Sequence, residues 1–328
     1  MTLSALRYSH PLALVLLALA VLAVSPATAQ DWPTRPVHMV VAGAPGSAPD
    51  VIARIIGNKL TEPWGQQIIV DNKPGAAGNL GTEAAAHAPA DGYTLLFGQA
   101  APLSMNRFVF KTLPFDVERD FVPVVNIGLS PMMIAANPTL PANTIGELAA
   151  LAKAQPGKLT FGTSSSRNIP HLTGELLKRA GGFDMTHVSY RANSQAMQDV
   201  VTGETQLMID GIPVIRPPVQ DGRLKALAVS SAKRLPGLET VPTVAETLPG
   251  FVSNGWFAVL APAKTPAGVV TRVNRDINQV LRNPEVTARM RDLGVYAEGG
   301  TPEELARFMK TDAAQWERIV RQAGIEPE

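Results

Sequence analysis

The chain has 328 residues, of which 45% are hydrophobic, with 29 Lys and Arg against 28 Asp and Glu and no cysteine. This balance of charge argues against nucleic acid as a partner and gives no field for an anionic membrane. The lack of cysteine excludes disulfides, thiol chemistry and a lipid-anchored N-terminus. Any recognition of an anion must therefore be local.

The first 29 residues have the pattern of a cleaved secretory signal peptide. Arg7 and His10 lie near the start, residues 12–24 are apolar, and Ala27-Thr28-Ala29 resembles a cleavage site. The apolar run is too short for a bilayer span, which needs about 20 residues. We expect the mature chain, residues 30–328, to lie in a bacterial periplasm, where a cysteine-free protein of this size is more usual than outside a eukaryotic cell.

The first predicted strand, residues 37–42, leads into a glycine turn and then a helix. Ser47 and Asp50, with a proline in the first helical turn, form a helix-start signature in which Ser47 caps and Asp50 hydrogen-bonds back. Such a turn exposes N–H groups and the positive end of a helix dipole, which suit an anion. A single strand–turn–helix unit of this kind could equally be an ordinary turn that binds no ligand. The same arrangement recurs along the chain, however, which favours an anion site.

Strands and helices alternate along the rest of the chain. The predicted strands are residues 37–42, 67–70, 93–98, 121–127, 129–137, 159–162, 185–190, 206–210, 225–230 and 251–261. The predicted helices are residues 51–60, 80–87, 144–154, 171–180, 195–202, 269–281 and 302–322. A further turn is expected at residues 211–213, forced by Pro213.

This alternation predicts an α/β fold with mainly parallel sheets and helices on their faces. We expect two lobes joined by two crossings of the chain. Residues 30–130 form the first part of lobe 1, residues 131–250 form lobe 2, and residues 251–328 return to lobe 1. Turns that follow parallel strands meet at one sheet edge, so the recurring turns should line one cleft.

Signatures of catalysis are absent. The histidines of the mature chain are His38, His87, His171 and His187, and none has metal-site spacing to another ligand. No G-x-S-x-G elbow and no phosphate-binding Gly-Lys-Ser/Thr occurs. His171, in the first turn of its helix, is expected to cap or pack. We therefore expect a binding protein that is not an enzyme and uses no cofactor and no metal.

Several stretches in order resemble the periplasmic receptors of tripartite tricarboxylate transporters, the Bug family. They include RPVHMVVAGAPGSAPDVIAR, VDNKPGAAGNLGTEAAAHAPADGYTLLFG, FGTSSSRNIPHLTGELL, DMTHVSYRANSQAMQDVVTGETQLMID and GWFAVLAPAKTP. The resemblance covers essentially the whole mature chain. It implies a periplasmic binding protein-like, two-lobed Venus flytrap. It also implies a carboxylate ligand, held between the first turn and the turn at residues 163–168.

The resemblance and the turns together give the predicted ligand-binding residues. These are Pro45, Gly46, Ser47, Ala48, Asp50, Gln99, Thr163, Ser164, Ser165, Ser166, Arg167, Asn168, Tyr190, Asn193, Ser194 and Asp210. We expect one carboxylate to lie on the backbone N–H groups of residues 46–48 and 164–166, with Asp50 shaping its own turn. Asp210, at a strand end, is either an acceptor that holds loops or a reactive carboxylate.

The departures from the family pattern fall at these turns. Ser47 stands where a second glycine is usual, and Arg167 stands where glycine is usual. Two outcomes are open for Arg167: it points into the cleft and pairs with a carboxylate through its planar fork, or it is a solvated rim residue.

Three functions remain open at this stage. The first is a solute receptor, expected to be monomeric, that delivers a small organic acid to the membrane subunits of a tripartite tricarboxylate-type transporter. The second is a sensor that presents its loaded form to a receptor kinase. The third is a periplasmic enzyme on the same scaffold, which turnover of the bound ligand would reveal.

Overall fold

One long strand, β4 (Phe121–Ala136), belongs to two sheets and joins them. Up to Pro131 it pairs with β9 (Asn254–Pro262) and β10 (Tyr296–Gly299). From Met132 onward it pairs with β7 (Leu207–Gly211) and β8 (Lys225–Val229). The two strands predicted at residues 121–127 and 129–137 are therefore one strand. We call the part built on the first sheet lobe 1 and the part built on the second sheet lobe 2.

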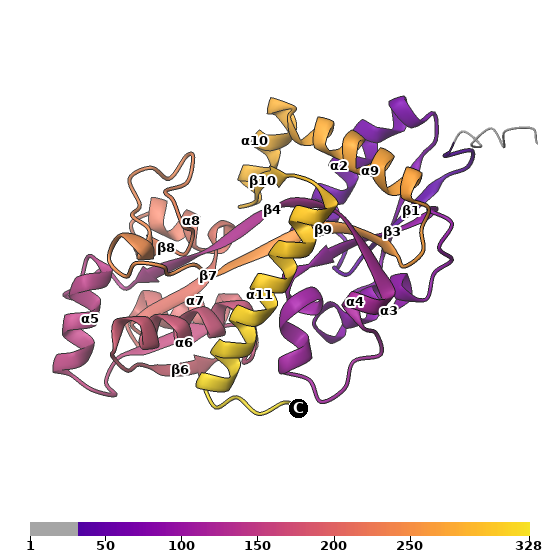
Figure 1. The fold of residues 1–328 in the computed structure, drawn as a ribbon. Coiled ribbons are helices and arrows are strands. Elements are labelled where there is room, and N and C mark those ends of the chain that lie inside the picture. The colour runs from indigo at the N-terminus through magenta and orange to yellow at the C-terminus, as the bar shows by residue number, and fades with distance from the viewer. Residues whose placement is uncertain (1–31) are drawn as a thin grey trace, which may run out of the picture. The chain divides into compact units, whose positions relative to one another are not determined.

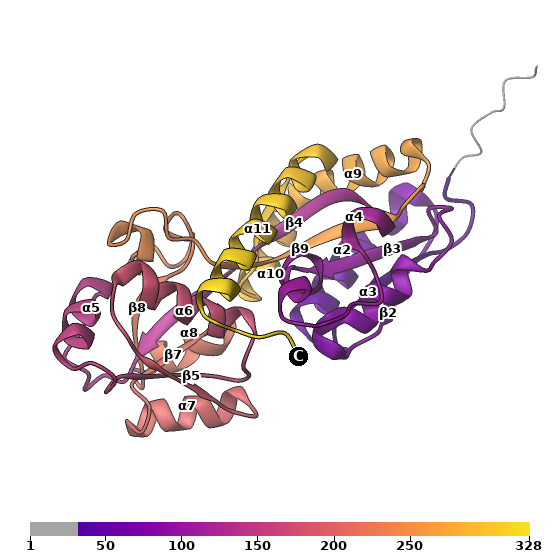
Figure 2. The same ribbon diagram turned by 60° about the horizontal axis from the view of Figure 1, so that its bottom comes forward.

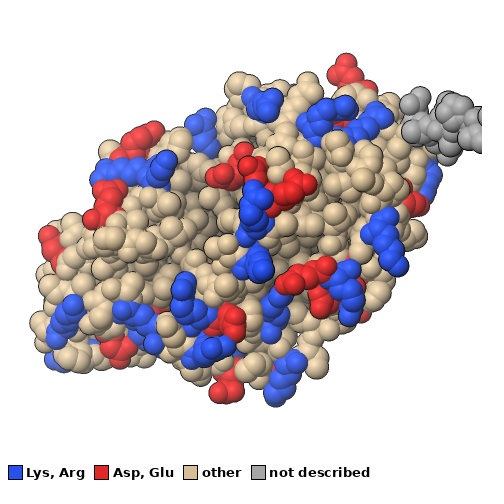
Figure 3. Space-filling view, in the orientation of Figure 1, with Lys and Arg blue, Asp and Glu red and all other residues tan. Residues whose placement is uncertain are grey.

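The computed structural model describes residues 32–328, and residues 35–328 form one unit. The predicted signal peptide lies outside the described residues. None of the helices within residues 32–328 has both the length and the apolar character to cross a bilayer. Figure 3 shows Lys and Arg interspersed with Asp and Glu over the face drawn, with no large field of one sign.

Each sheet combines a parallel core with antiparallel crossing strands. In lobe 1, β1 (Val37–Val41) lies between β2 (Ile68–Asn72) and β3 (Thr94–Gln99), all parallel, and β9 pairs antiparallel with β3. In lobe 2, β5 (Thr160–Thr163) lies parallel between β6 (Thr186–Ser189) and β7, which pairs antiparallel with β4. The sheets are thus mixed rather than mainly parallel, because the crossing strands run back through both.

The helices cover these sheets (Figure 1). They are α2 (Ala48–Trp64), α3 (Asn79–Ala86), α4 (Val117–Asp120), α5 (Ile145–Ala154), α6 (Ile169–Gly181), α7 (Asn193–Thr202), α8 (Ile212–Gln220), α9 (Ala267–Leu281), α10 (Pro284–Asp292) and α11 (Pro302–Gln322). The predicted turn at residues 211–213 is wrong, since α8 begins at Ile212. Pro213 lies in the first helical turn, where a missing N–H costs nothing. Helix α10 and strand β10 were not predicted.

Helix α11 packs along both lobes (Figures 1 and 2). Its Asp312 Oδ2 accepts hydrogen bonds from Trp256 Nε1 (2.8 Å), Trp316 Nε1 (3.0 Å) and Ser104 Oγ (2.5 Å). Gln315 Nε2 donates to the carbonyl of Val252, beside the return crossing, at 2.6 Å. Because Trp256 and Trp316 are fully buried, the carboxylate fixes β9 and α11 against each other at the wall of the cleft described below.

Candidate ligand-binding cleft

A cavity of about 600 Å³ lies between the lobes. Lobe 1 contributes residues from the second glycine turn and from the end of β3: Ala76, Ala77, Gln99, Ala100, Ala101 and Met105. The crossing strands contribute Ser130, Met132, Gly255, Trp256 and Phe257. Lobe 2 contributes Ser165, Ser166, Arg167, Asn168, Ile169, Pro170, Asp210 and Gly211. The walls are therefore largely apolar, with a few polar groups gathered on lobe 2, as in small-molecule sites generally.

The lobe 2 wall is the turn between β5 and α6. Asn168 caps α6, because its side-chain oxygen accepts the N–H of His171 at 2.9 Å, and Pro170 lies in the first turn. Within residues 32–328, the N–H groups of Ser164, Ser165 and Ser166 donate to no acceptor. Three free donors beside the positive end of a helix dipole form a site suited to a carboxylate.

Arg167 completes this turn in an unusual backbone conformation. Its φ is 60°, the left-handed region that glycine adopts without strain, which explains why glycine is usual there. Its Nη1 lies 2.6 Å from Glu328 Oε2, and both residues line the cavity. The Arg167 side chain is 34% exposed. Neither open outcome describes it fully: the guanidinium faces the cleft and is paired there with a carboxylate of the same chain.

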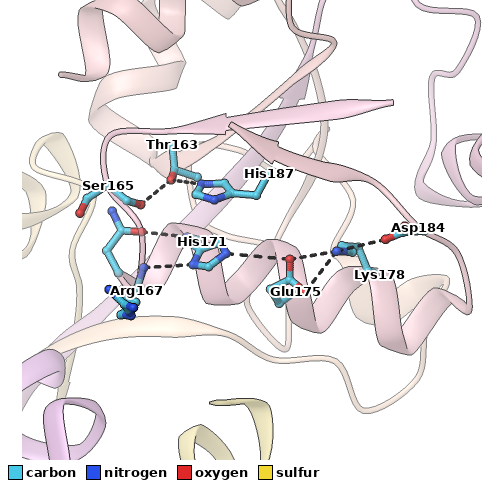
Figure 4. A network of polar contacts seen from close by, with 9 residues as sticks. Thr163, Ser165, Arg167, His171, Glu175, Lys178, Asp184 and His187 are labelled. Carbon is cyan, nitrogen blue, oxygen red and sulfur yellow. Dashed lines mark hydrogen bonds and ion pairs between the residues drawn. The ribbon is translucent and has the colours of Figure 1, made fainter. Parts of the chain in front are cut away.

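Two stacked histidines contact the turn from one side (Figure 4). The rings of His171 and His187 lie 3.9 Å apart between centroids, and Phe161 packs 5.0 Å from His187. The N–H of Arg167 donates to His171 Nδ1 at 3.0 Å, so this nitrogen carries no proton. Thr163 Oγ1 donates to the carbonyl of Ser165 at 2.7 Å, so His187 Nε2 must donate to Thr163 at 2.8 Å.

The contact with Arg167 requires the imidazole of His171 to be neutral, and burial favours the neutral form of both rings. Burial, together with the charges of Lys178 and Arg167, lowers the pKa of His171 to about 4. Burial, together with the neighbouring His171, lowers the pKa of His187 to about 4. The expectation that His171 packs is therefore extended by the structure: it also accepts a backbone N–H of the binding turn.

The first predicted turn does not line this cavity. Asp50 Oδ2 accepts the N–H of Gly46 at 2.9 Å, and Arg54 Nε donates to Asp50 Oδ1 at 3.0 Å. Burial raises the pKa of Asp50, but the hydrogen bonds of Arg54, Gly46 and Asn72 outweigh it and the pKa is lowered. Ser47 occupies the cap position without capping, since its hydroxyl donates to the carbonyl of Ala44. The capping pair predicted for Ser47 and Asp50 is therefore wrong.

The backbone of the first turn is also less available than expected. The N–H of Gly46 is taken by Asp50, and that of Ser47 by the carbonyl of Ala44 at 3.1 Å. Of the three donors predicted at residues 46–48, Ala48 alone has no acceptor within the described residues. Pro45 and Gly46 are exposed on this turn, outside the cavity.

The other predicted residues divide between wall and support. Gln99 lines the cavity while its amide donates to the carbonyl of Ala42 at 2.7 Å. Thr163 is fully buried under the turn, and Ser164 does not line the cavity. The Tyr190 hydroxyl donates to Asp199 at 2.8 Å, away from the cavity. Asn193 and Ser194 lie at the start of α7 and are not among the lining residues.

Sequence reasoning missed several lining residues. Ala76 and Ala77 have positive φ values of 47° and 53°, and the glycine turn that contains them was the available signal. Trp256 and Phe257 lie on the return crossing, which was predicted as a strand but not as a wall. For Glu328 no sequence signal existed. No group of three or more metal-ligating side chains occurs within residues 32–328.

We expect Asp50→Asn to keep ligand binding within about tenfold, or roughly 1.4 kcal/mol. The amide oxygen can still accept the N–H of Gly46, and the residue does not line the cavity. Calorimetric titration with a confirmed ligand checks this. Abolished binding in a folded Asp50→Asn protein would show that the first turn contacts the ligand directly.

The family model described as the tripartite tricarboxylate transporter family receptor matches residues 52–325. The chain belongs to this family. BugT of Bordetella pertussis is 33% identical over 92% of this chain and 93% of its own length. A UPF0065 protein from Pseudomonas sp. strain P51 is 38% identical over 88% of this chain and 86% of its own length.

Two solved structures that contain organic acids are similar to this chain. Rpa4515 of R. palustris, with adipate, is 35% identical with a TM-score of 0.77, and the match covers 90% of this chain and all of that one. MatC of Rhodopseudomonas palustris, with bound malate, is 29% identical with a TM-score of 0.71, covering 88% of this chain and all of that one. This chain therefore shares the fold of these two structures.

Proposed function

We propose that this receptor captures a small organic carboxylate in the cleft between its lobes and delivers it to the membrane subunits of a tripartite tricarboxylate-type transporter in the periplasm. The observation that carries the proposal is the turn before α6. Ser165 and Ser166, whose N–H groups have no acceptor within residues 32–328, line together with Arg167 a cavity whose walls are largely apolar. The adipate and malate held by two relatives support a carboxylate as the ligand.

The carboxylate lies on the N–H groups of residues 164–166, with its charge balanced by the α6 dipole and by Arg167. The first turn contributes shape through Asp50 and does not line the cavity. No nucleophile is paired with a base among the residues within 32–328 that line the cavity. We expect the ligand to be released unchanged.

A thermal-shift screen of carboxylates on the purified mature protein tests this proposal, because a ligand that binds the folded state alone raises its stability. A hit should be recovered intact by mass spectrometry. If no carboxylate binds, the proposed ligand class is wrong. If the chain is needed for a response of a receptor kinase and not for uptake, the delivery step is wrong and the sensor alternative stands.

We further infer that residues 131–250 move as one lobe against residues 30–130 and 251–328. Both lobes line the cavity, so a ligand that bridges them favours closure. We expect the radius of gyration from small-angle X-ray scattering to fall when a confirmed ligand saturates the protein. An unchanged radius would contradict closure.

A further inference from the structure

Asp210 is a buried carboxylate that lacks a partner for one of its oxygens. It ends β7 in lobe 2, lines the cavity and is 8% exposed. Its Oδ1 accepts the N–H of Gly211 at 2.7 Å. Its Oδ2 is buried and meets no donor within residues 32–328. Buried carboxylate oxygens are normally hydrogen-bonded, because removing an ionised group from water is costly.

No cation of the described chain compensates this charge. None of the ion pairs formed within residues 32–328 includes Asp210. The charged residues that line the cavity are Arg167, Asp210 and Glu328, and the first and last of these pair with each other. Burial raises the pKa of Asp210 to about 6, despite the hydrogen bond from Gly211. The carboxylate of Asp210 is therefore a negatively charged hydrogen-bond acceptor that faces the cavity.

A purely structural role accounts for only half of this side chain. Oδ1 shapes the turn that leads from β7 into α8, and the oxygen of an asparagine amide would serve there equally well. The unpartnered Oδ2 forms no hydrogen bond that shapes the turn. Its burial beside the cavity costs free energy as long as no donor is present. A donor carried by the ligand would remove that cost.

We propose that Asp210 recognises a hydrogen-bond donor on the bound carboxylate, with an ammonium group favoured over a hydroxyl group. This inference rests on the proposed carboxylate-binding function and narrows its ligand class. A molecule with a carboxylate for the turn at residues 164–168 and an ammonium for Asp210 matches the charges of the cavity. An ammonium fits Asp210 better than a hydroxyl because a charged donor forms the stronger bond with a carboxylate.

Matched series of acids test the inference on the wild-type protein. Each series keeps one carbon chain and changes one substituent: succinate, malate and aspartate; glutarate, 2-hydroxyglutarate and glutamate; propionate, lactate and alanine. One of these chain lengths is expected to bind. Within that series, calorimetric titration should give at least tenfold tighter binding for the amino acid than for the unsubstituted acid. The hydroxy acid should lie between them.

The variant Asp210→Asn should reduce this preference to about twofold or less, while its amide oxygen still accepts the N–H of Gly211. Asp221→Asn, an exposed carboxylate of lobe 2 paired with Arg223, is the matched control and should leave the preference unchanged. If the Asp210 variant does not fold, the wild-type series still tests the inference, because equal binding of all three acids in a series overturns it.

The outcomes separate this inference from the proposed function. If unsubstituted acids bind as tightly as their amino and hydroxy analogues, Asp210 reads no donor, while the carboxylate receptor stands. If the preference survives in a folded Asp210→Asn protein, another group reads the donor and the inference is overturned. If no acid of any series binds, the proposed function falls and this inference with it.

Discussion

Acidification from pH 7 to pH 4 is expected to remove about 6 kcal/mol of stability through His171 and His187 alone, roughly 3 kcal/mol for each ring. Both rings are held neutral in the fold, with a pKa of about 4, whereas an unfolded chain binds protons at the ordinary value of 6.5. Between pH 6.5 and pH 4 the unfolded state therefore binds more protons. Stability must fall as the pH falls through this window.

Asp210 acts in the opposite direction. Its pKa of about 6 in the fold lies above the ordinary value of 3.8, so the folded state binds its proton first. Protonation of Asp210 therefore stabilises the fold by about 2 kcal/mol as the pH falls from 6 toward 4. A net loss of roughly 4 kcal/mol remains for these groups, a large part of the stability of an ordinary domain.

Substitutions that keep the hydrogen bonds isolate the histidines. Asparagine at position 171 places an oxygen near the site of Nδ1, and glutamine at position 187 places an N–H near the site of Nε2. The double variant His171→Asn/His187→Gln should therefore fold. Its free energy of unfolding, measured with urea, should fall less steeply between pH 6.5 and pH 4 than that of the wild type. His87→Gln, on the surface, is the control and should keep the wild-type slope. An equally steep slope in the double variant would mean that the rings titrate normally.

The order of strands and helices was predictable from the sequence, because it follows from local patterns. Helix α11, with its threonine cap and apolar stripe, was predicted at residues 302–322 with both ends correct. Helix α8 was missed because it contains Pro213, Pro217 and Pro218, and prolines argue against a helix. The first of them lies in the first turn, where a helix tolerates proline. The mixed sheets were not predictable, since strand direction depends on partners far away in the sequence.

The parts of the candidate site that were predictable from the sequence are those that lie within a single strand-to-helix connection. Residues 165–168 and Asp210 line the cavity as parts of strand-to-helix connections, which a sequence displays. Glu328 reaches Arg167 from 161 positions away, and no local pattern reveals such a contact. The first turn failed as a donor site because Asp50 and Ala44 already accept two of its three N–H groups. Which acceptors of the chain take these N–H groups is seen only in the folded structure.

Removal of the Arg167 side chain is expected to weaken carboxylate binding by about 1.5–3 kcal/mol, the range for a hydrogen bond to a charged group. Arg167 faces the cavity, and its guanidinium already binds a carboxylate there, that of Glu328. The ligand is expected to take the place of this internal carboxylate. Arg167→Lys should recover only part of the loss, since an ammonium lacks the planar fork.

The left-handed backbone at this position decides which variants are informative. Alanine at a φ of 60° keeps the backbone strain of about 1–2 kcal/mol that the wild-type arginine already has, so Arg167→Ala removes the guanidinium and leaves the strain in place. Arg167→Gly removes the same side chain and relieves the backbone. Equal losses of affinity in the two variants, measured by calorimetric titration, would assign the effect to the guanidinium.

Glu328→Gln tests the competition from the other side. Freed from its internal partner, Arg167 should bind a ligand up to about fivefold more tightly, which corresponds to the value of roughly 1 kcal/mol at most for an exposed ion pair. The same change should have no effect in the Arg167→Gly background, because no guanidinium remains there to release. Wild-type affinity in Arg167→Gly would instead make the arginine a rim residue, and the carboxylate would then depend on the N–H groups of residues 164–166 and the α6 dipole alone.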